Sequence, residues 1–343
     1  MDMNDSARPF VSIIMPIRNE QRYIGKSLRS VLGQDYPAQK MEILIVDGMS
    51  TDGTLDAVRA VLDQAKAPSR NAPGDVVVLS NPSRIVPCAL NIGLARARGK
   101  VIIRVDGHCE IAPDYVRQCI EVLNSSAADC VGGAIRTVGE TRLAEAIALA
   151  QSSFFGAGNA AFRRGLRRGI YVDTVAFGAY RRGLFDRIGA FDEELVRNQD
   201  DEFNFRLIQN GGKIWMDPSI QSIYYSRSDL HSLWRQYFQY GFYKIRVMQK
   251  RKTVLSSRHL IPALFLFAAI SGLILALLFC NIVFAIIVLG PYIIMNIAAT
   301  VVLAREKRSS LIYLPVIFPV LHFAYGLGTL AGIWRWRKHF LPT

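Results

Sequence analysis

The chain has 343 residues, which is room for one large domain or two ordinary ones, and 51% of them are hydrophobic. Its formal net charge of +13 fits three kinds of partner: nucleic acid, an anionic membrane surface or a phosphate-bearing substrate. No zinc-finger spacing or RNA-binding signature is present, so nucleic acid is set aside. Five cysteines without a C-x-x-C pair argue against a disulfide framework or a cysteine metal site.

The first hundred residues alternate between strand-like and helix-like patterns. Short apolar runs predict strands, and stretches with apolar residues three or four apart predict helices between them. This alternation is typical of parallel βαβ units in an α/β fold. The strands are expected at 11–15, 42–46, 76–79 and 101–105, and the helices at 22–32, 54–64 and 87–98.

Each of these strands ends on polar residues. Arg18-Asn19-Glu20 follow the first strand, and Asp47, Asn81 and Asp106 follow the other three. Such residues are also common in ordinary turns. Because ligands of parallel sheets bind at the carboxyl ends of the strands, four polar ends together predict a binding site.

After about Cys130 the pattern changes. A glycine-rich strand is expected over 131–139 and an amphipathic helix over 142–155. A basic loop at 162–169, a strand-like run at 172–180, an acidic cluster at 198–202 and a short strand at 213–216 follow.

The segment from Asp229 to Lys252 interleaves aromatic and basic residues. This composition fits a helix lying in a membrane interface, and the alternative is a core helix of the soluble domain. We favour the interface because apolar segments follow directly.

Three long apolar segments occupy the last part of the chain, at 260–279, 282–304 and 311–333. Each is long enough to span the hydrocarbon core of a bilayer, which is roughly 30 Å thick. Basic residues flank all three, and positive residues prefer the cytoplasm. We therefore predict that the third segment is re-entrant or kinked and does not cross. The N-terminus has no apolar signal-peptide region, so the soluble part is expected in the cytoplasm.

The segment VSIIMPIRNE, followed about thirty residues later by ILIVDGMSTDGT, resembles the opening of family 2 glycosyltransferases, which have a GT-A fold. The resemblance extends over roughly Val11–Gly241. It implies that the first strand ends hold the base and ribose of a nucleotide-sugar, and physically a carboxylate such as that of Asp47 can accept from a uracil N–H. The donor-binding residues it implies are Pro16, Arg18, Asn19, Glu20, Asp47, Ser50, Asp52, Gly53, Arg84 and Asp106. Asp52 and Thr54 also suit a helix N-cap.

The fourth strand ends on Asp106-Gly107-His108, which resembles the family's DxD motif with His108 in place of the second Asp. Residues i and i+2 of an extended chain lie on one side, so Asp106 and His108 could both face one metal ion. Mn²⁺ or Mg²⁺ is the expected cofactor, and the imidazole shifts the preference toward Mn²⁺.

Asn198-Gln199-Asp200-Asp201-Glu202, with Arg206 further on, resembles the family's ED motif. The resemblance implies an inverting transfer in which Asp200 takes the proton of the acceptor hydroxyl, with Asp201 as the adjacent alternative. A solvated helix start is the ordinary explanation of three successive acids. Four loop arginines are a candidate clamp for the acceptor's diphosphate, as opposed to a solvated basic loop. They are Arg163, Arg164, Arg167 and Arg168.

No Q-x-x-R-W motif of processive synthases is present, which predicts single addition. The motifs look most like the bacterial succinoglycan-type exopolysaccharide glucosyltransferases, which implies glucose from UDP-glucose and a polyprenyl-diphosphate-linked acceptor. Other enzymes of polysaccharide assembly are candidate partners. A polyprenyl-phosphate sugar synthase and a non-catalytic scaffold are the alternatives.

The expected organisation has three parts and a location at the inner (plasma) membrane with several crossings. Residues 1–225 form a cytoplasmic GT-A domain with a Rossmann-like, mostly parallel sheet. Residues 226–256 form interfacial helices, and residues 257–343 form a transmembrane or re-entrant region.

Overall fold

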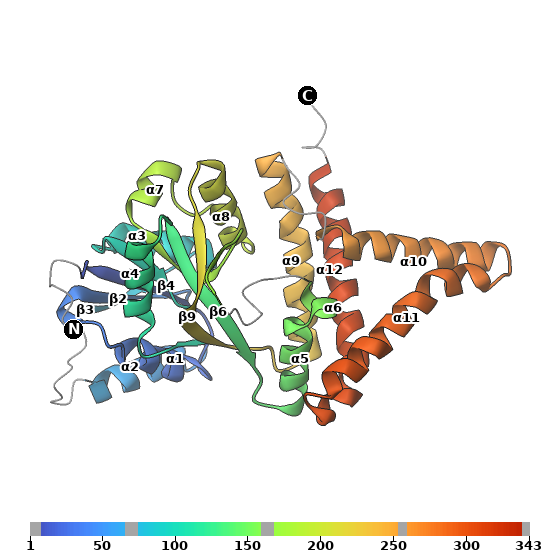
Figure 1. The fold of residues 1–343 in the computed structure, drawn as a ribbon, viewed down its shortest axis with the longest axis horizontal. Coiled ribbons are helices and arrows are strands. Elements are labelled where there is room, and N and C mark those ends of the chain that lie inside the picture. Colours follow the sequence, from blue (N-terminus) through green and yellow to red (C-terminus); the bar gives the residue numbers. More distant parts are fainter. Residues whose placement is uncertain (1–7, 66–74, 159–167, 253–258, 338–343) are drawn as a thin grey trace. The chain divides into compact units, whose positions relative to one another are not determined.

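A computed structural model describes residues 8–65, 75–158, 168–252 and 259–337 (Figure 1). The chain divides into two compact units. The first comprises residues up to Arg136 together with Ala161–Tyr224, and the second comprises Thr137–Ala160 together with the chain from Tyr225 onward. The sequence alone placed residues 1–225 in one domain, whereas the structure assigns an internal segment of that range to the second unit.

The first unit contains the predicted parallel sheet. The strands are β1 (Val11–Ile17), β2 (Met41–Asp47), β3 (Asp75–Ser80) and β4 (Val101–Arg104). Strand β1 lies between β2 and β4, and β2 pairs with β3, all in parallel. Every residue of β1 and β2 is buried, as expected for strands covered on both faces.

Helices connect these strands, as the sequence predicts. They are α1 (Ile24–Leu32), α2 (Thr54–Ala65) and α3 (Val86–Arg96), and α4 (Tyr115–Ser125) follows later. Side chains of α1, α2 and α4 share one buried cluster with the sheet residue Ile13, while those of α3 share another with Ile14. Because neighbouring strand residues point to opposite faces, the two clusters cover the two sides of the sheet.

The other half of the sheet is mostly antiparallel. Its strands are β5 (Cys109–Ile111), β6 (Cys130–Val138), β7 (Ile170–Tyr171), β8 (Ala176–Arg181) and β9 (Ile214–Tyr225). The order along the sheet is β3-β2-β1-β4-β8-β6-β9-β5, with β7 beside β9. Helices α7 (Gly183–Ile188) and α8 (Gln199–Gln209) complete this unit (Figure 1). The fold is thus Rossmann-like with a parallel first half, as predicted, and the antiparallel strands make the whole sheet mixed.

The second unit is helical. It contains α5 (Arg142–Ser152), α6 (Phe154–Ala157), α9 (Leu230–Arg251), α10 (Ile261–Leu278), α11 (Val283–Ala304), the short 3-10 helix η5 (Arg308–Ile312) and α12 (Leu314–Trp336). One buried cluster joins α5, α9 and α12, with Ile147, Tyr237 and Phe318 among its members. Helices α10, α11 and α12 are each long and apolar enough to cross a membrane.

The third apolar segment forms one continuous helix, α12, through Pro319, so it does not fold back on itself as a re-entrant segment would. The kink and the lack of a crossing stay predictions. A proline cannot donate to the carbonyl four residues earlier. Here that carbonyl, of Pro315, accepts instead from the Asn296 side chain of α11 at 3.1 Å. A neighbouring helix therefore satisfies the group that Pro319 leaves unpaired.

Candidate functional site

The loops after β1 and β2 are joined by a chain of hydrogen bonds. The backbone N–H of Asn19 donates to the Ser50 hydroxyl (2.9 Å), and that hydroxyl donates to Asp47 Oδ1 (2.6 Å). The Asn19 side chain in turn accepts from the N–H of Thr51 (2.9 Å). Asn19 and Met49 both adopt positive φ, which lets the two loops turn toward each other. The structure thus brings together the predicted donor residues Asn19, Asp47 and Ser50.

The start of α2 fastens to the loop after β1. Asp52 Oδ1 accepts from the Thr54 N–H (3.0 Å), as expected of a residue that caps the helix, and the Thr54 hydroxyl accepts from the Glu20 N–H (2.8 Å). Partial burial raises the pKa of Asp52, but hydrogen bonds from Thr54 and Gln21 outweigh it and hold the pKa below its ordinary value. Gly53 donates its N–H to the Gln21 side chain.

Two predicted arginines meet beside the end of β3. Arg18 donates to the carbonyl of Arg84 (3.2 Å), and both side chains are exposed. Arg84 adopts positive φ, and its N–H donates to Asn81, whose own N–H donates to the Asp47 carbonyl. Pro16 lies within β1 opposite Val46. The predicted donor residues therefore gather at the carboxyl edge of β1, β2 and β3.

The end of β4 carries a close ion pair. Arg104 Nε donates to Asp106 Oδ1 (2.7 Å) and Arg104 Nη2 donates to Asp106 Oδ2 (2.9 Å). The same guanidinium reaches Asp200 Oδ2 through Nη1 at 3.5 Å. Burial raises the pKa of Asp106, but Arg104 outweighs burial and holds that pKa below its ordinary value. Burial lowers the pKa of Arg104, yet Asp106 and Asp200 raise it overall.

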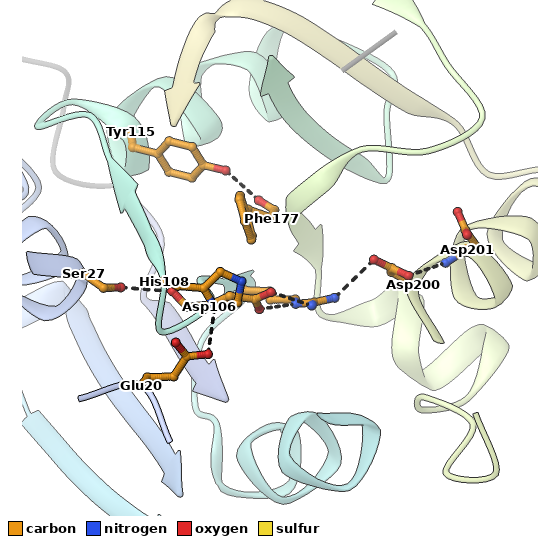
Figure 2. A network of polar contacts seen from close by, with 9 residues as sticks. Glu20, Ser27, Asp106, His108, Tyr115, Phe177, Asp200 and Asp201 are labelled. Atoms are coloured by element: carbon orange, nitrogen blue, oxygen red, sulfur yellow. Dashed lines mark hydrogen bonds and ion pairs between the residues drawn. The ribbon is translucent and has the colours of Figure 1, made fainter. Parts of the chain in front are cut away.

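His108 is oriented by a carboxylate and an aromatic ring. Its Nδ1 lies 2.8 Å from Glu20 Oε1 (Figure 2). Its ring also makes a T-shaped contact with the ring of Tyr224. Gly107 permits this approach, because a Cβ there would lie 3.0 Å from Glu20 Cγ and 3.1 Å from Ile17 Cγ2. A proton on Nδ1, shared with Glu20, places the lone pair of a neutral imidazole on Nε2.

The donor set of this turn fits a divalent ion. Asp106 supplies carboxylate oxygens, and a carboxylate bonded to the far nitrogen is the usual support of a metal-binding histidine. Within the described ranges no group of three or more His, Cys, Asp or Glu side chains could hold a metal. Asp106 and His108 stay the predicted protein ligands, and such a two-residue site would leave coordination positions for donor phosphates, as is common for Mg²⁺.

Helix α8 presents the acidic cluster. Asn198 precedes it with positive φ, and the Asp201 N–H donates to Asp200 Oδ1 (2.9 Å). The Asp200 side chain is 38% exposed and turned toward the Arg104–Asp106 pair, whereas the carboxylate of Asp201 points away (Figure 2). Glu202 is fully buried and paired with Arg206 at 2.7 Å. Glu202 therefore has a structural partner, and Asp200 is the acid that faces the site.

Three of the four clamp arginines, Arg163, Arg164 and Arg167, lie outside the described residues. Arg168 is described and exposed. The clamp stays a prediction.

Sequence reasoning did not assign Arg104. The signal was present, because an arginine two residues before an aspartate on a strand lies on the same face. Its second partner, Asp200, is 96 residues away and only the fold reveals it. Sequence reasoning also did not assign Tyr115, which is buried and donates to the carbonyl of Phe177 (2.6 Å), a residue with positive φ at the start of β8 (Figure 2).

Comparisons with known proteins agree with this geometry. The sequence model described as glycosyl transferase family 2 matches residues 12–189. The chain is 30% identical, over 96% of its length and 99% of the relative's, to a dolichyl N-acetyl-alpha-D-glucosaminyl phosphate 3-beta-D-2,3-diacetamido-2,3-dideoxy-beta-D-glucuronosyltransferase of Methanococcus voltae. It is 31% identical, over 73% of each chain, to the succinoglycan biosynthesis protein ExoA of Rhizobium meliloti.

A solved structure shares the fold. The mannosyltransferase PcManGT from Pyrobaculum calidifontis, in complex with GDP-Man and Mn²⁺, superposes with a TM-score of 0.59 at 18% identity, over 96% of this chain and 88% of that one. The strand order, the polar strand ends and these matches lead to one conclusion: the chain belongs to the family 2 glycosyltransferases and has a GT-A catalytic fold.

Proposed function

We propose that this protein is an inverting, non-processive glycosyltransferase that moves one hexose, glucose from UDP-glucose, onto a polyprenyl-diphosphate-linked saccharide in exopolysaccharide biosynthesis. The observation that carries the proposal is the Arg104 bridge. It joins Asp106, at the strand end where a nucleotide diphosphate binds in such folds, to Asp200, the candidate base. The Arg104 guanidinium therefore contacts both the donor side and the acceptor side of the proposed site.

The donor half is supported by the loops after β1 and β2. Asp47 is almost fully buried and is held by the Ser50 hydroxyl and N–H, so its carboxylate has a fixed direction. A fixed acceptor group suits recognition of a base edge. A divalent ion held by Asp106 and His108 would neutralise charge on the leaving diphosphate.

The acceptor half rests on Asp200. Its carboxylate takes the proton as the acceptor hydroxyl oxygen attacks the anomeric carbon from the face opposite the diphosphate. The new C–O bond forms while the bond to the diphosphate oxygen breaks, and the nucleoside diphosphate leaves with that electron pair. Arg104 Nη1, at 3.5 Å from Asp200 Oδ2, fixes the position of this carboxylate beside the donor half of the site.

The relatives' names support a lipid-linked acceptor. The Methanococcus voltae protein is named for transfer to a dolichyl-phosphate-linked sugar, and ExoA for succinoglycan biosynthesis. A sugar already on the lipid is the acceptor in that name, which favours our proposal over a polyprenyl-phosphate sugar synthase. We place the enzyme at the inner membrane with the catalytic unit in the cytoplasm, where nucleotide-sugars are made.

The proposal is tested with purified protein in detergent. Labelled UDP-sugars and GDP-mannose are incubated with polyprenyl-diphosphate-linked saccharides or polyprenyl phosphate, with Mn²⁺ or with EDTA. We expect metal-dependent label from UDP-glucose in a lipid-linked disaccharide. Asp200→Asn should lose at least a hundredfold in kcat, whereas Asp201→Asn, the matched control on the same turn, should lose less than tenfold.

The other outcomes separate the alternatives. Label on polyprenyl phosphate alone would assign a sugar-phosphate synthase, and label from another donor would replace glucose. No transfer and no nucleotide-sugar binding from any donor would indicate a scaffold.

A further inference from the structure

Helices α9 and α12 are in backbone contact along much of their length. A Cβ added at Gly328 would lie 2.0 Å from the carbonyl oxygen of Phe238, and one at Gly332 would lie 2.7 Å from that of Phe242. From α9, Gly241 approaches the carbonyl of Tyr325 in the same way. The two helices therefore run side by side in the same direction (Figure 1). Both must consequently take the same orientation relative to a membrane.

Helix α9 is too polar to cross a bilayer. Its cations are spread over its length, from Arg235 through Lys244 and Arg246 to Lys250 and Arg251. Each would add about 2.5–3.5 kcal/mol at the centre of a membrane-crossing helix. The end of α12 lies within this cationic stretch, because the Trp336 ring packs on Phe242 at 4.4 Å and faces the Arg246 guanidinium at 5.9 Å.

Helices α10 and α11 form a hairpin that is more exposed than α12. Both helices contact α12 away from their connecting tip: Gly326 approaches the carbonyl of Pro262 at the start of α10, and the hydroxyl of Tyr292, near the middle of α11, lies 2.9 Å from His322 Nδ1. Their tip is uncovered, with Leu277 79% exposed and Ile282 70% exposed. In the most apolar 18-residue stretch of each helix, the buried share is 44% for α12, 22% for α10 and 17% for α11. The hairpin thus points away from α12, which lies across its base (Figure 1).

We infer that the α10–α11 hairpin alone crosses the bilayer and that α12, despite its apolar composition, lies along the membrane surface beside α9. The partner of the hairpin's exposed side chains is the hydrocarbon core. At 18 and 22 residues the helices are about 27 and 33 Å long, which is enough to cross it. The inference rests on the proposed membrane attachment and not on the transferase activity.

Charge supports this arrangement. Basic residues stand before the hairpin, directly after it and at the end of α12, at Lys250–Lys252, Arg305–Arg308 and Arg335–Arg337. With two crossings all three groups lie on one face, whereas a third crossing would put the last group on the other. The exposed Trp334 beside Arg335 suits headgroup depth.

The native cysteines make the test direct. Cys280, at the hairpin tip, is exposed, and the other four cysteines are buried, with burial raising the pKa of their thiols. A membrane-impermeant maleimide therefore reports on Cys280 in the native chain. In a Cys280→Ser background, single cysteines at the exposed positions Arg59→Cys, Ser309→Cys and Arg335→Cys report on the catalytic unit and on the two ends of α12.

Labelling is compared in sealed inside-out and right-side-out membrane vesicles. We expect positions 59, 309 and 335 to be labelled from one face and Cys280 from the other. Labelling of 335 from the face opposite 309 would show that α12 crosses and would overturn the inference. Cys280 unreactive from both faces until detergent is added would overturn the crossing of the hairpin. Because no step measures sugar transfer, failure of the proposed function would leave these outcomes readable.

Discussion

At the scale of single residues, the centre of the site is a cation shared by two carboxylates. Asp106 and Asp200 come from different motifs, and Arg104 contacts both. Without the guanidinium each carboxylate would lose a charge-assisted hydrogen bond and face the other's charge. We therefore regard Arg104 as a positioning residue for both.

Arg104→Gln tests this role. Hydrogen bonds between charged groups contribute about 1.5–3 kcal/mol, so we expect kcat/KM to fall roughly 10- to 100-fold, with the donor's dissociation constant and kcat both affected. Arg104→Lys should recover part of the loss. Steady-state kinetics and calorimetric titration of the donor separate the two effects.

Arg98→Gln is the matched control. Arg98 also bridges two carboxylates, Glu42 (2.8 Å) and Asp75 (2.5 Å), but it does so beside the first residues of β2 and β3, at the opposite edge of the sheet. The Arg98→Gln change should lower the melting temperature and leave kcat/KM within about threefold of the unsubstituted enzyme. Equal kinetic losses in both variants would refute a specific role for Arg104.

The sequence predicted much of this centre but not its connections. Asp47, Asp106 and Asp200 stand at strand ends or in a recognisable motif, so their types and places were readable. The bridge was not, because an ion pair across 96 residues depends on where β4 and α8 lie in the fold. The buried Glu202–Arg206 pair shows the same limit, since three successive acids look alike in sequence and only packing distinguishes them.

At the scale of elements, close helix packing in the second unit depends on glycine. Helices α9 and α12 approach so closely that Gly328 has no room for a methyl group. We expect Gly328→Ala to destabilise the folded protein in detergent by about 1–3 kcal/mol, as overpacking does in other close-packed interiors. Thermal or chemical unfolding followed by intrinsic tryptophan fluorescence measures it.

Gly290→Ala provides the comparison. Gly290 lies within α11, and the nearest heavy atom to a Cβ added there would be Ile286 Cγ2 at 3.6 Å, an ordinary contact. This change should be neutral or stabilising, because alanine favours a helix over glycine by about 1 kcal/mol. A similar destabilisation in both variants would mean that α9 and α12 are not in backbone contact.

The elements themselves were largely predictable, but their partners were not. The four parallel strands, the helices between them and the three apolar segments follow from periodicity and composition. The amphipathic pattern of α5 indicated a helix with a buried face, yet nothing local showed that its partners, α9 and α12, begin about 80 and 160 residues later. The re-entrant alternative for α12 was not excluded from sequence, because Asn296 on another helix supplies the hydrogen bond that Pro319 cannot.

At the scale of the whole molecule, the catalytic unit is not a continuous piece of chain. Its sheet continues after a segment, Thr137–Ala160, whose helix α5 buries Ala146, Ile147 and Ala150 in the second unit. A chain shortened to residues 1–227 would keep the whole sheet but leave this face of α5 uncovered. Exposed apolar patches of this kind promote association.

At this scale we predict that one substitution improves the behaviour of the shortened chain and harms the full chain. In the shortened chain, Ile147→Lys should reduce aggregation, because it breaks the uncovered apolar face. In the full chain the same change should destabilise the protein by several kcal/mol, since it buries a charge among apolar side chains. Size-exclusion chromatography with light scattering and thermal unfolding measure the two effects, and the same direction in both chains would contradict the assignment of α5 to the second unit.

The early position of α5 also has a consequence during synthesis. Leu321 and Ala324 of α12, which cover α5 in the finished protein, are made more than 160 residues after it. At about 5–20 residues per second, the ribosome leaves the apolar face of α5 without its final partner for roughly ten to thirty seconds. Until α9 and α12 have been made, α5 therefore lacks the helices that bury its apolar face in the finished protein.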